Sequence, residues 1–131
     1  MKKHTKKNIS ETDYKNVLNK LEDVFESTTA KFMVVGSLLT AVETGTYLSD
    51  LDKFEFIVSK RSLNKYALTV LKENLGESWQ DFEENGVPIK VKVINKNYKF
   101  MKYPDVRYYQ GCTLYIPNPL SDYLKIKQLI K

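Results

Sequence analysis

The residues of this chain that could do chemistry are two aspartates, Asp50 and Asp52, and a Gly-Ser pair, Gly36 and Ser37, that precedes them. On an extended segment the two carboxylates would point to the same side, and such a pair suits a hard divalent cation such as Mg²⁺, with Mn²⁺ as an alternative. A bound Mg²⁺ would hold the phosphates of a substrate. Gly36 lets the backbone turn sharply and lets a ligand approach. Ser37 can cap a helix and offers a hydroxyl where anions are favoured.

Short elements on either side of these residues must position them. The apolar run Phe32–Val35 predicts a buried strand directly before the Gly-Ser pair, and residues 38–43 predict a short helix after it. Residues 54–58 predict the next strand, directly after the aspartates. Strand alternation leaves two places open for Glu55, which either faces the same cleft as the aspartates or lies in solvent.

This combination of buried strand, Gly-Ser turn, short helix and Asp-x-Asp resembles the core motif of the polymerase-beta-like nucleotidyltransferase superfamily, and the resemblance covers residues 15–131. It implies a nucleotidyltransferase-type fold and Mg²⁺-dependent transfer of a nucleotide from a nucleoside triphosphate to a hydroxyl. It assigns Asp50 and Asp52 as catalytic and metal-binding residues, and Gly36 and Ser37 as nucleotide-binding residues. The acceptor, on RNA, protein or a small molecule, and the base preference stay open.

The last helix expected in the chain carries a second, weaker resemblance. The strand, the Ile-Pro-Asn-Pro break and the Tyr-Leu-Lys-Ile-Lys helix of residues 113–131 are similar to the end of the nucleotidyltransferase core in abortive-infection toxin-type members. A lysine on that helix is expected to reach the nucleotide, so the resemblance assigns this place to Lys125 or Lys127. A solvated basic helix face is the alternative interpretation.

The third carboxylate of the family pattern is missing from its expected strand. The strand predicted over residues 87–94 carries Lys90 and Lys92 on its polar face. A protonated lysine cannot bind Mg²⁺ and repels it, although it can neutralise phosphate charge. Four other acids could substitute geometrically: Glu55, Asp81, Glu83 and Glu84. Activity is therefore expected to be weak or lost. The alternatives are an inactive protein of this fold that binds nucleotide, nucleic acid or a protein partner, and an unrelated basic α/β nucleic-acid-binding domain.

The rest of the chain predicts one α/β domain over residues 10–131, a small mixed sheet with packed helices, behind a disordered basic tail of residues 1–9. The Asn85-Gly86 pair predicts a hairpin. Three further helices are expected: one that begins at Ser10 and ends at residues 27–29, one over 62–75 with Ser62 as N-cap and Tyr66 on its buried face, and a final one from Pro119. Further strands are expected at 79–84, 106–110 and 113–116, with a loop over 95–105.

The length and composition of the chain limit the kinds of protein that it can be. A chain of 131 residues fits one domain, and its net charge of +5 favours an anionic partner such as a nucleotide, RNA or DNA. The single cysteine, Cys112, excludes an internal disulfide and accords with a cytoplasmic location. No apolar run of about eighteen residues is present, so no membrane span is expected. The sole histidine, His4, lies in the tail, which argues against histidine catalysis and a histidine-bound zinc.

Overall fold

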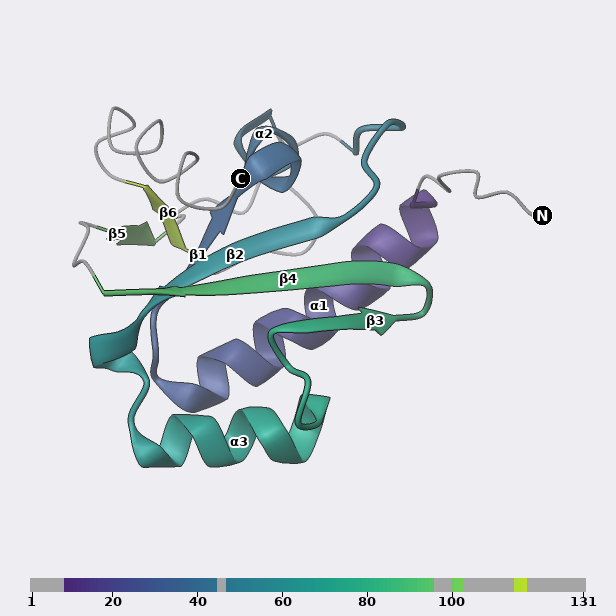
Figure 1. Cartoon of the computed structure of the whole chain (residues 1–131). Helices are drawn as coiled ribbons and strands as arrows, with labels where there is room; N and C mark the ends of the chain where they lie inside the picture. Colours follow the sequence, from purple (N-terminus) through teal and green to yellow (C-terminus); the bar gives the residue numbers. More distant parts are fainter. Residues whose placement is uncertain (1–8, 45–46, 96–99, 103–114, 118–131) are drawn as a thin grey trace.

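The computed structural model describes residues 9–44, 47–95, 100–102 and 115–117, and within them the chain forms a mixed α/β fold (Figure 1). This confirms the expected fold class, a small mixed sheet with packed helices. In chain order the elements are α1 (Glu11–Thr28), β1 (Phe32–Val35), α2 (Gly36–Thr44), β2 (Phe54–Ser59), the 3-10 helix η1 (Lys60–Ser62), α3 (Lys65–Leu75), β3 (Asp81–Glu84), β4 (Val87–Ile94), β5 (Phe100–Lys102) and β6 (Tyr115–Pro117).

The strands of the described residues form one sheet in the order β3-β4-β2-β1-β6-β5. β1 and β2 are antiparallel, with Val35 opposite Glu55. β2 and β4 are parallel, with Glu55 opposite Lys90 and Ile57 opposite Lys92, and the crossover between them contains α3. Because side chains alternate along each strand, this register puts Glu55, Lys90 and Lys92 on one face of the central strands.

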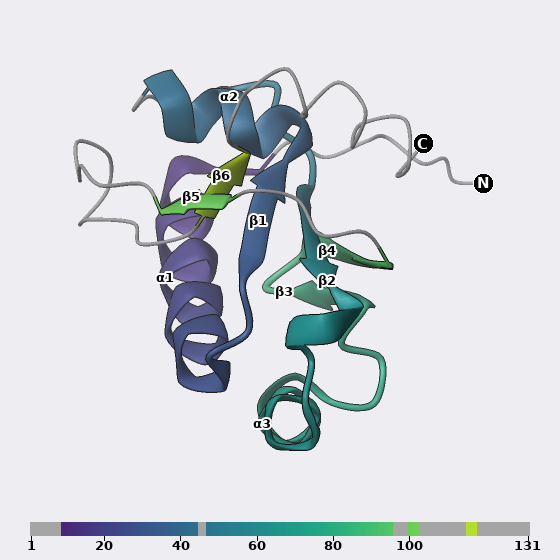
Figure 2. The ribbon, with the colours of Figure 1, turned by 90° about the vertical axis from the view of Figure 1, so that its left-hand side faces the viewer.

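The opposite face of the sheet is covered by α1, which Figures 1 and 2 both show along one side of the strands. Ser10 is the N-cap of this helix, as predicted, and its hydroxyl accepts a hydrogen bond of 3.1 Å from the N–H of Asp13. Phe25 stacks on Phe32 of β1, with ring centroids 3.9 Å apart. The apolar stripe expected on this helix is buried: Tyr14, Val17, Leu18, Leu21, Val24 and Phe25.

The start of α3 differs from the sequence expectation. Asn64, not Ser62, is the N-cap, and its side-chain oxygen accepts a hydrogen bond of 2.8 Å from the N–H of Ala67. Ser62 instead belongs to η1. Tyr66 was expected on the buried face but is 59% exposed, because Ala67, Val70 and Leu71 form the buried stripe at helical spacing and Tyr66 lies to one side of it.

The strands also differ from the expectation in three places. β3 begins only at Asp81, because Trp79 lies in a turn, where its ring is buried. β5 lies within residues 95–105, which were expected to form a loop because most of them are polar, and its three residues pair with β6. Pro117 was expected to break the sheet but is the last residue of β6. Two other expected elements lie outside the described residues: the strand at 106–110 and the final helix from Pro119.

The domain already includes Ile9, which was expected to end the basic tail. Its side chain is buried, and its N–H donates a hydrogen bond of 2.9 Å to the carbonyl of Leu51. Its own carbonyl accepts a hydrogen bond from the hydroxyl of Tyr47. An apolar side chain and two backbone hydrogen bonds thus hold Ile9 beside the loop that carries Asp50 and Asp52. Residues 1–8 lie outside the described part of the chain.

Candidate functional site

The turn from β1 into α2 is built on Gly36. Its φ of +69° lies in the left-handed region that side chains disfavour. A Cβ added at this position would overlap the Oε1 of Glu55 and lie 3.0 Å from its Cδ. Gly36 is therefore needed for its backbone conformation and for the space that it leaves to Glu55. The carboxylate of Glu55 packs directly against the backbone at the start of α2.

Ser37 does not cap this helix, contrary to the prediction. The helix begins at Gly36, before Ser37, because the glycine itself makes the turn out of the strand. Ser37 is exposed in the first helical turn. Its hydroxyl therefore remains accessible close to the helix N-terminus, where anions are favoured.

The two aspartates lie on the loop before β2, on either side of Leu51. Asp50 is exposed in a turn, and Asp52 is half-buried. Leu51 is fully buried, its N–H donates a hydrogen bond of 3.1 Å to the carbonyl of Leu48, and its own carbonyl accepts the hydrogen bond from Ile9. Leu51 therefore anchors the loop. The extended segment assumed for the pair is interrupted by the turn at Asp50, so strand alternation does not make the two carboxylates converge.

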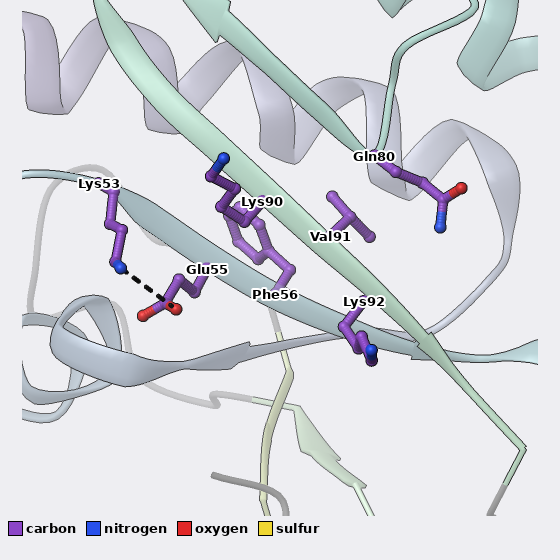
Figure 3. Close-up of a pocket in the computed structure, with 7 residues that line it drawn as sticks. All are labelled: Lys53, Glu55, Phe56, Gln80, Lys90, Val91 and Lys92. Carbon is purple, nitrogen blue, oxygen red and sulfur yellow. Dashed lines mark ion pairs between the residues drawn. The ribbon is translucent and has the colours of Figure 1, made fainter. Parts of the chain in front are cut away.

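A partly open groove of about 280 Å³ lies over β2 and β4, and the register places its charged side chains on the face opposite α1. Figure 3 shows Lys53 and Glu55 reaching toward one another beside β2, and Lys90 and Lys92 along β4, with α1 behind the strands. Neither Asp50 nor Asp52 lines this groove. The groove residues are Lys53, Glu55, Phe56, Gln80, Lys90, Val91 and Lys92.

Among the described residues, three lysine ammonium groups and one carboxylate line the groove. The Nζ of Lys53 is 3.9 Å from the Oε2 of Glu55, which is a loose ion pair. The Nζ of Lys90 is 2.7 Å from the Oδ1 of Asp81, on the neighbouring edge strand. Lys92 forms no ion pair with any residue that the structure describes. The groove is therefore positively charged and favours an anion.

Of the four acids that could replace the missing third carboxylate, only Glu55 lines the groove. Asp81 pairs with Lys90, and Glu84 pairs with Lys20 of α1 at 2.8 Å. Nowhere in the described ranges do three His, Cys, Asp or Glu side chains gather so that they could hold a metal ion. The aspartates before β2 therefore form no closed metal cage. Mg²⁺ is often bound by one or two carboxylates plus substrate phosphates, so one of these aspartates on its own is enough to serve as a protein ligand.

The sequence pattern did not identify Lys53 and Gln80 as groove residues, nor the contact between Glu55 and Gly36. The position of Lys53 could have been predicted, because it lies two residues before Glu55 and strand alternation puts both side chains on the same face of the sheet. Gln80 reaches the groove through the pairing of β3 with β4, and nothing local marks it; its carbonyl accepts a hydrogen bond of 2.9 Å from the N–H of Val91. The lysines assigned to the nucleotide lie outside the described residues: Lys125 and Lys127.

Comparison of the chain with models of protein families, with curated proteins and with solved structures gives no match. Within the described residues, the groove and the turn at Gly36 are the features that bear on function. Within the part of the chain that the structure describes, no helix combines the length and the apolar character needed to cross a membrane.

Proposed function

We propose that this chain binds a nucleoside triphosphate, with its phosphates over Lys53, Lys90 and Lys92, and that it is a nucleotidyltransferase-like protein with weak or lost transfer activity. The observation that carries the proposal is the groove, a cavity of about 280 Å³ to which the described part of the chain contributes three ammonium groups and one carboxylate. Ligand pockets typically enclose about 300–1,000 Å³, so this cavity suits a phosphate chain better than a whole nucleotide. Each ammonium can donate three hydrogen bonds to phosphate oxygens.

The turn at Gly36 supports the nucleotidyltransferase type. A fully buried strand leads directly into a glycine without room for a Cβ, and the neighbouring strand contributes the acid that packs on it. Mg²⁺ or Mn²⁺ would arrive with the nucleotide, neutralise phosphate charge and take Asp50 and Asp52 as its candidate protein ligands. The same proposal includes a hydroxyl group as the acceptor of the nucleotide and the cytoplasm as the location of the protein.

Weak or lost transfer follows from the lysines on β4. In a transfer reaction the attacking hydroxyl must give up its proton, and a carboxylate close to the phosphorus can accept it. The ammonium groups of Lys90 and Lys92 have no lone pair for that proton. Among the described residues that line the groove only Glu55 has a carboxylate that could accept it, and that carboxylate is in contact with Lys53 and Gly36. The lysines thus favour binding of phosphate over its transfer.

Titration calorimetry with ATP and GTP, with Mg²⁺ or with EDTA, tests binding. We expect affinity to fall at least about tenfold in Lys90→Ala/Lys92→Ala, since one charge–charge contact near 4 Å contributes about 1 kcal/mol in bulk water and about 4 kcal/mol near a protein surface. Lys65→Ala/Lys72→Ala is the matched control, because it removes two exposed lysines of α3 that lie outside the groove. Asp50→Ala/Asp52→Ala should weaken binding only when Mg²⁺ is present.

Two results would contradict this proposal. No nucleotide binding by the folded chain at low salt would remove the assigned ligand, and binding of RNA, DNA or a protein instead would favour the inactive alternative. Robust Mg²⁺-dependent transfer from an α-labelled nucleoside triphosphate would show that activity has been kept. In that case Glu55 is the acid to substitute next, since it is the groove's only carboxylate among the described residues.

A further inference from the structure

The acid of the groove, Glu55, is held in place from two sides. Its side chain is only 18% exposed. Its carboxylate packs on the backbone of Gly36, where no Cβ would fit, and its strand neighbour Val35 is fully buried. Lys53 approaches it from the open side. Glu55 therefore has little room to withdraw when an anion enters.

We infer that Glu55 is a built-in competitor of the phosphate ligand, because it occupies the ammonium of Lys53 and adds a negative charge to the groove. The inference rests on the proposed function, since it concerns the same groove. The separation of 3.9 Å between the Nζ of Lys53 and the Oε2 of Glu55 is long for an ion pair. A phosphate oxygen closer to Lys53 can therefore replace the carboxylate as its partner.

The extent to which Glu55 weakens binding depends on the charge of the phosphate ligand. Repulsion from Glu55 grows with the number of negative charges that the ligand brings, so Glu55 opposes a triphosphate chain more than a single phosphate. The opposition is screened by salt, because the groove is partly open. Glu55 thus determines how strongly the groove discriminates among phosphate ligands of different charge.

The test is titration calorimetry of the whole chain with tripolyphosphate and with orthophosphate, in EDTA and at low salt. Glu55→Gln keeps the shape of the side chain and removes its charge. We expect it to bind tripolyphosphate about tenfold more tightly than the unmodified chain, with a smaller gain for orthophosphate and both gains reduced by salt. Glu73→Gln is the matched control, because it removes the same charge from an exposed site on α3 outside the groove. It should change affinity less than about twofold.

A second comparison tests the role of Lys53. In a Lys53→Ala background the gain from Glu55→Gln should shrink, since no ammonium is left to release. Equal or weaker binding by Glu55→Gln, while the unmodified chain binds, would overturn this inference alone. Absence of binding in both would overturn the proposed function as well. Thermal melting reports the fold of each variant, and Glu55→Ala takes the place of Glu55→Gln if the latter does not fold.

Discussion

Replacing Gly36 by alanine tests the packing on which the groove depends. The left-handed φ of +69° costs an alanine about 1–2 kcal/mol. The added Cβ also overlaps the carboxylate of Glu55, and forcing an extra methyl group into a packed site adds about 1 kcal/mol. We therefore expect Gly36→Ala to lower the free energy of unfolding by about 2–3 kcal/mol.

Two comparisons separate these costs. Gly86 has a φ of +79°, and an added Cβ would meet nothing within 4 Å, so Gly86→Ala should show the backbone cost alone. Glu55→Ala should remove the overlap, so the double variant Gly36→Ala/Glu55→Ala should lose less than the two single losses combined. The expected coupling is about 1 kcal/mol.

The measurement is thermal or urea unfolding followed by circular dichroism. For a chain of this size 1 kcal/mol corresponds to about 3–5 °C, so Gly36→Ala should melt about 10 °C lower and Gly86→Ala about half as much lower. Equal losses for the two glycines would mean that Glu55 does not pack on Gly36. If the double variant Gly36→Ala/Glu55→Ala lost as much stability as the two single variants together, Glu55 would likewise not pack on Gly36. Either result would remove the geometric basis of the groove.

Two further predictions concern the supports of the site. Leu51→Ala should destabilise the chain by about 2–5 kcal/mol in urea unfolding, because it empties a fully buried position, whereas Asp50→Ala next to it is exposed and should change stability by less than about 0.5 kcal/mol. Comparable losses would show that Leu51 is not the anchor of the loop. Ser10→Ala should cost about 1 kcal/mol by removing the hydrogen bond to the N–H of Asp13, and Ser10→Gly should cost less. An unchanged melting temperature would argue against the cap.

Local patterns were sufficient to predict much of the fold. The stripe on α1, its cap at Ser10 and the strand before Gly36 each follow from residues close together in the sequence, and the structure confirms them. The hairpin at Asn85-Gly86 is of the same kind, since a positive φ at both residues matches the turn that such a pair favours. Where two local signals competed, the prediction failed: Ser62 and Asn64 are both good caps, but the hydroxyl of Ser62 donates a hydrogen bond to the carbonyl of Ser59, and Asn64 caps the helix.

The candidate site was less predictable, because its residues meet through strand pairing. Glu55 reaches Gly36 only because β1 and β2 pair with Val35 opposite Glu55, and a shift of one residue would turn Glu55 into the core. Lys90 and Lys92 were correctly assigned to one face from alternation alone. That this face also holds Glu55 depends on the parallel pairing of β2 with β4, which no local pattern specifies.

The contact between Ile9 and the aspartate loop has a consequence for proteolytic trimming of the chain. Cleavage before Ile9 leaves both of its backbone hydrogen bonds intact, whereas cleavage one residue later removes the partner of Leu51 and of Tyr47 together. Those two residues hold the loop that carries Asp50 and Asp52. A protease working inward from the N-terminus would therefore leave both hydrogen bonds to this loop in place until it cuts after Ile9, and from then on the loop would be held by the buried side chain of Leu51 and its hydrogen bond to Leu48.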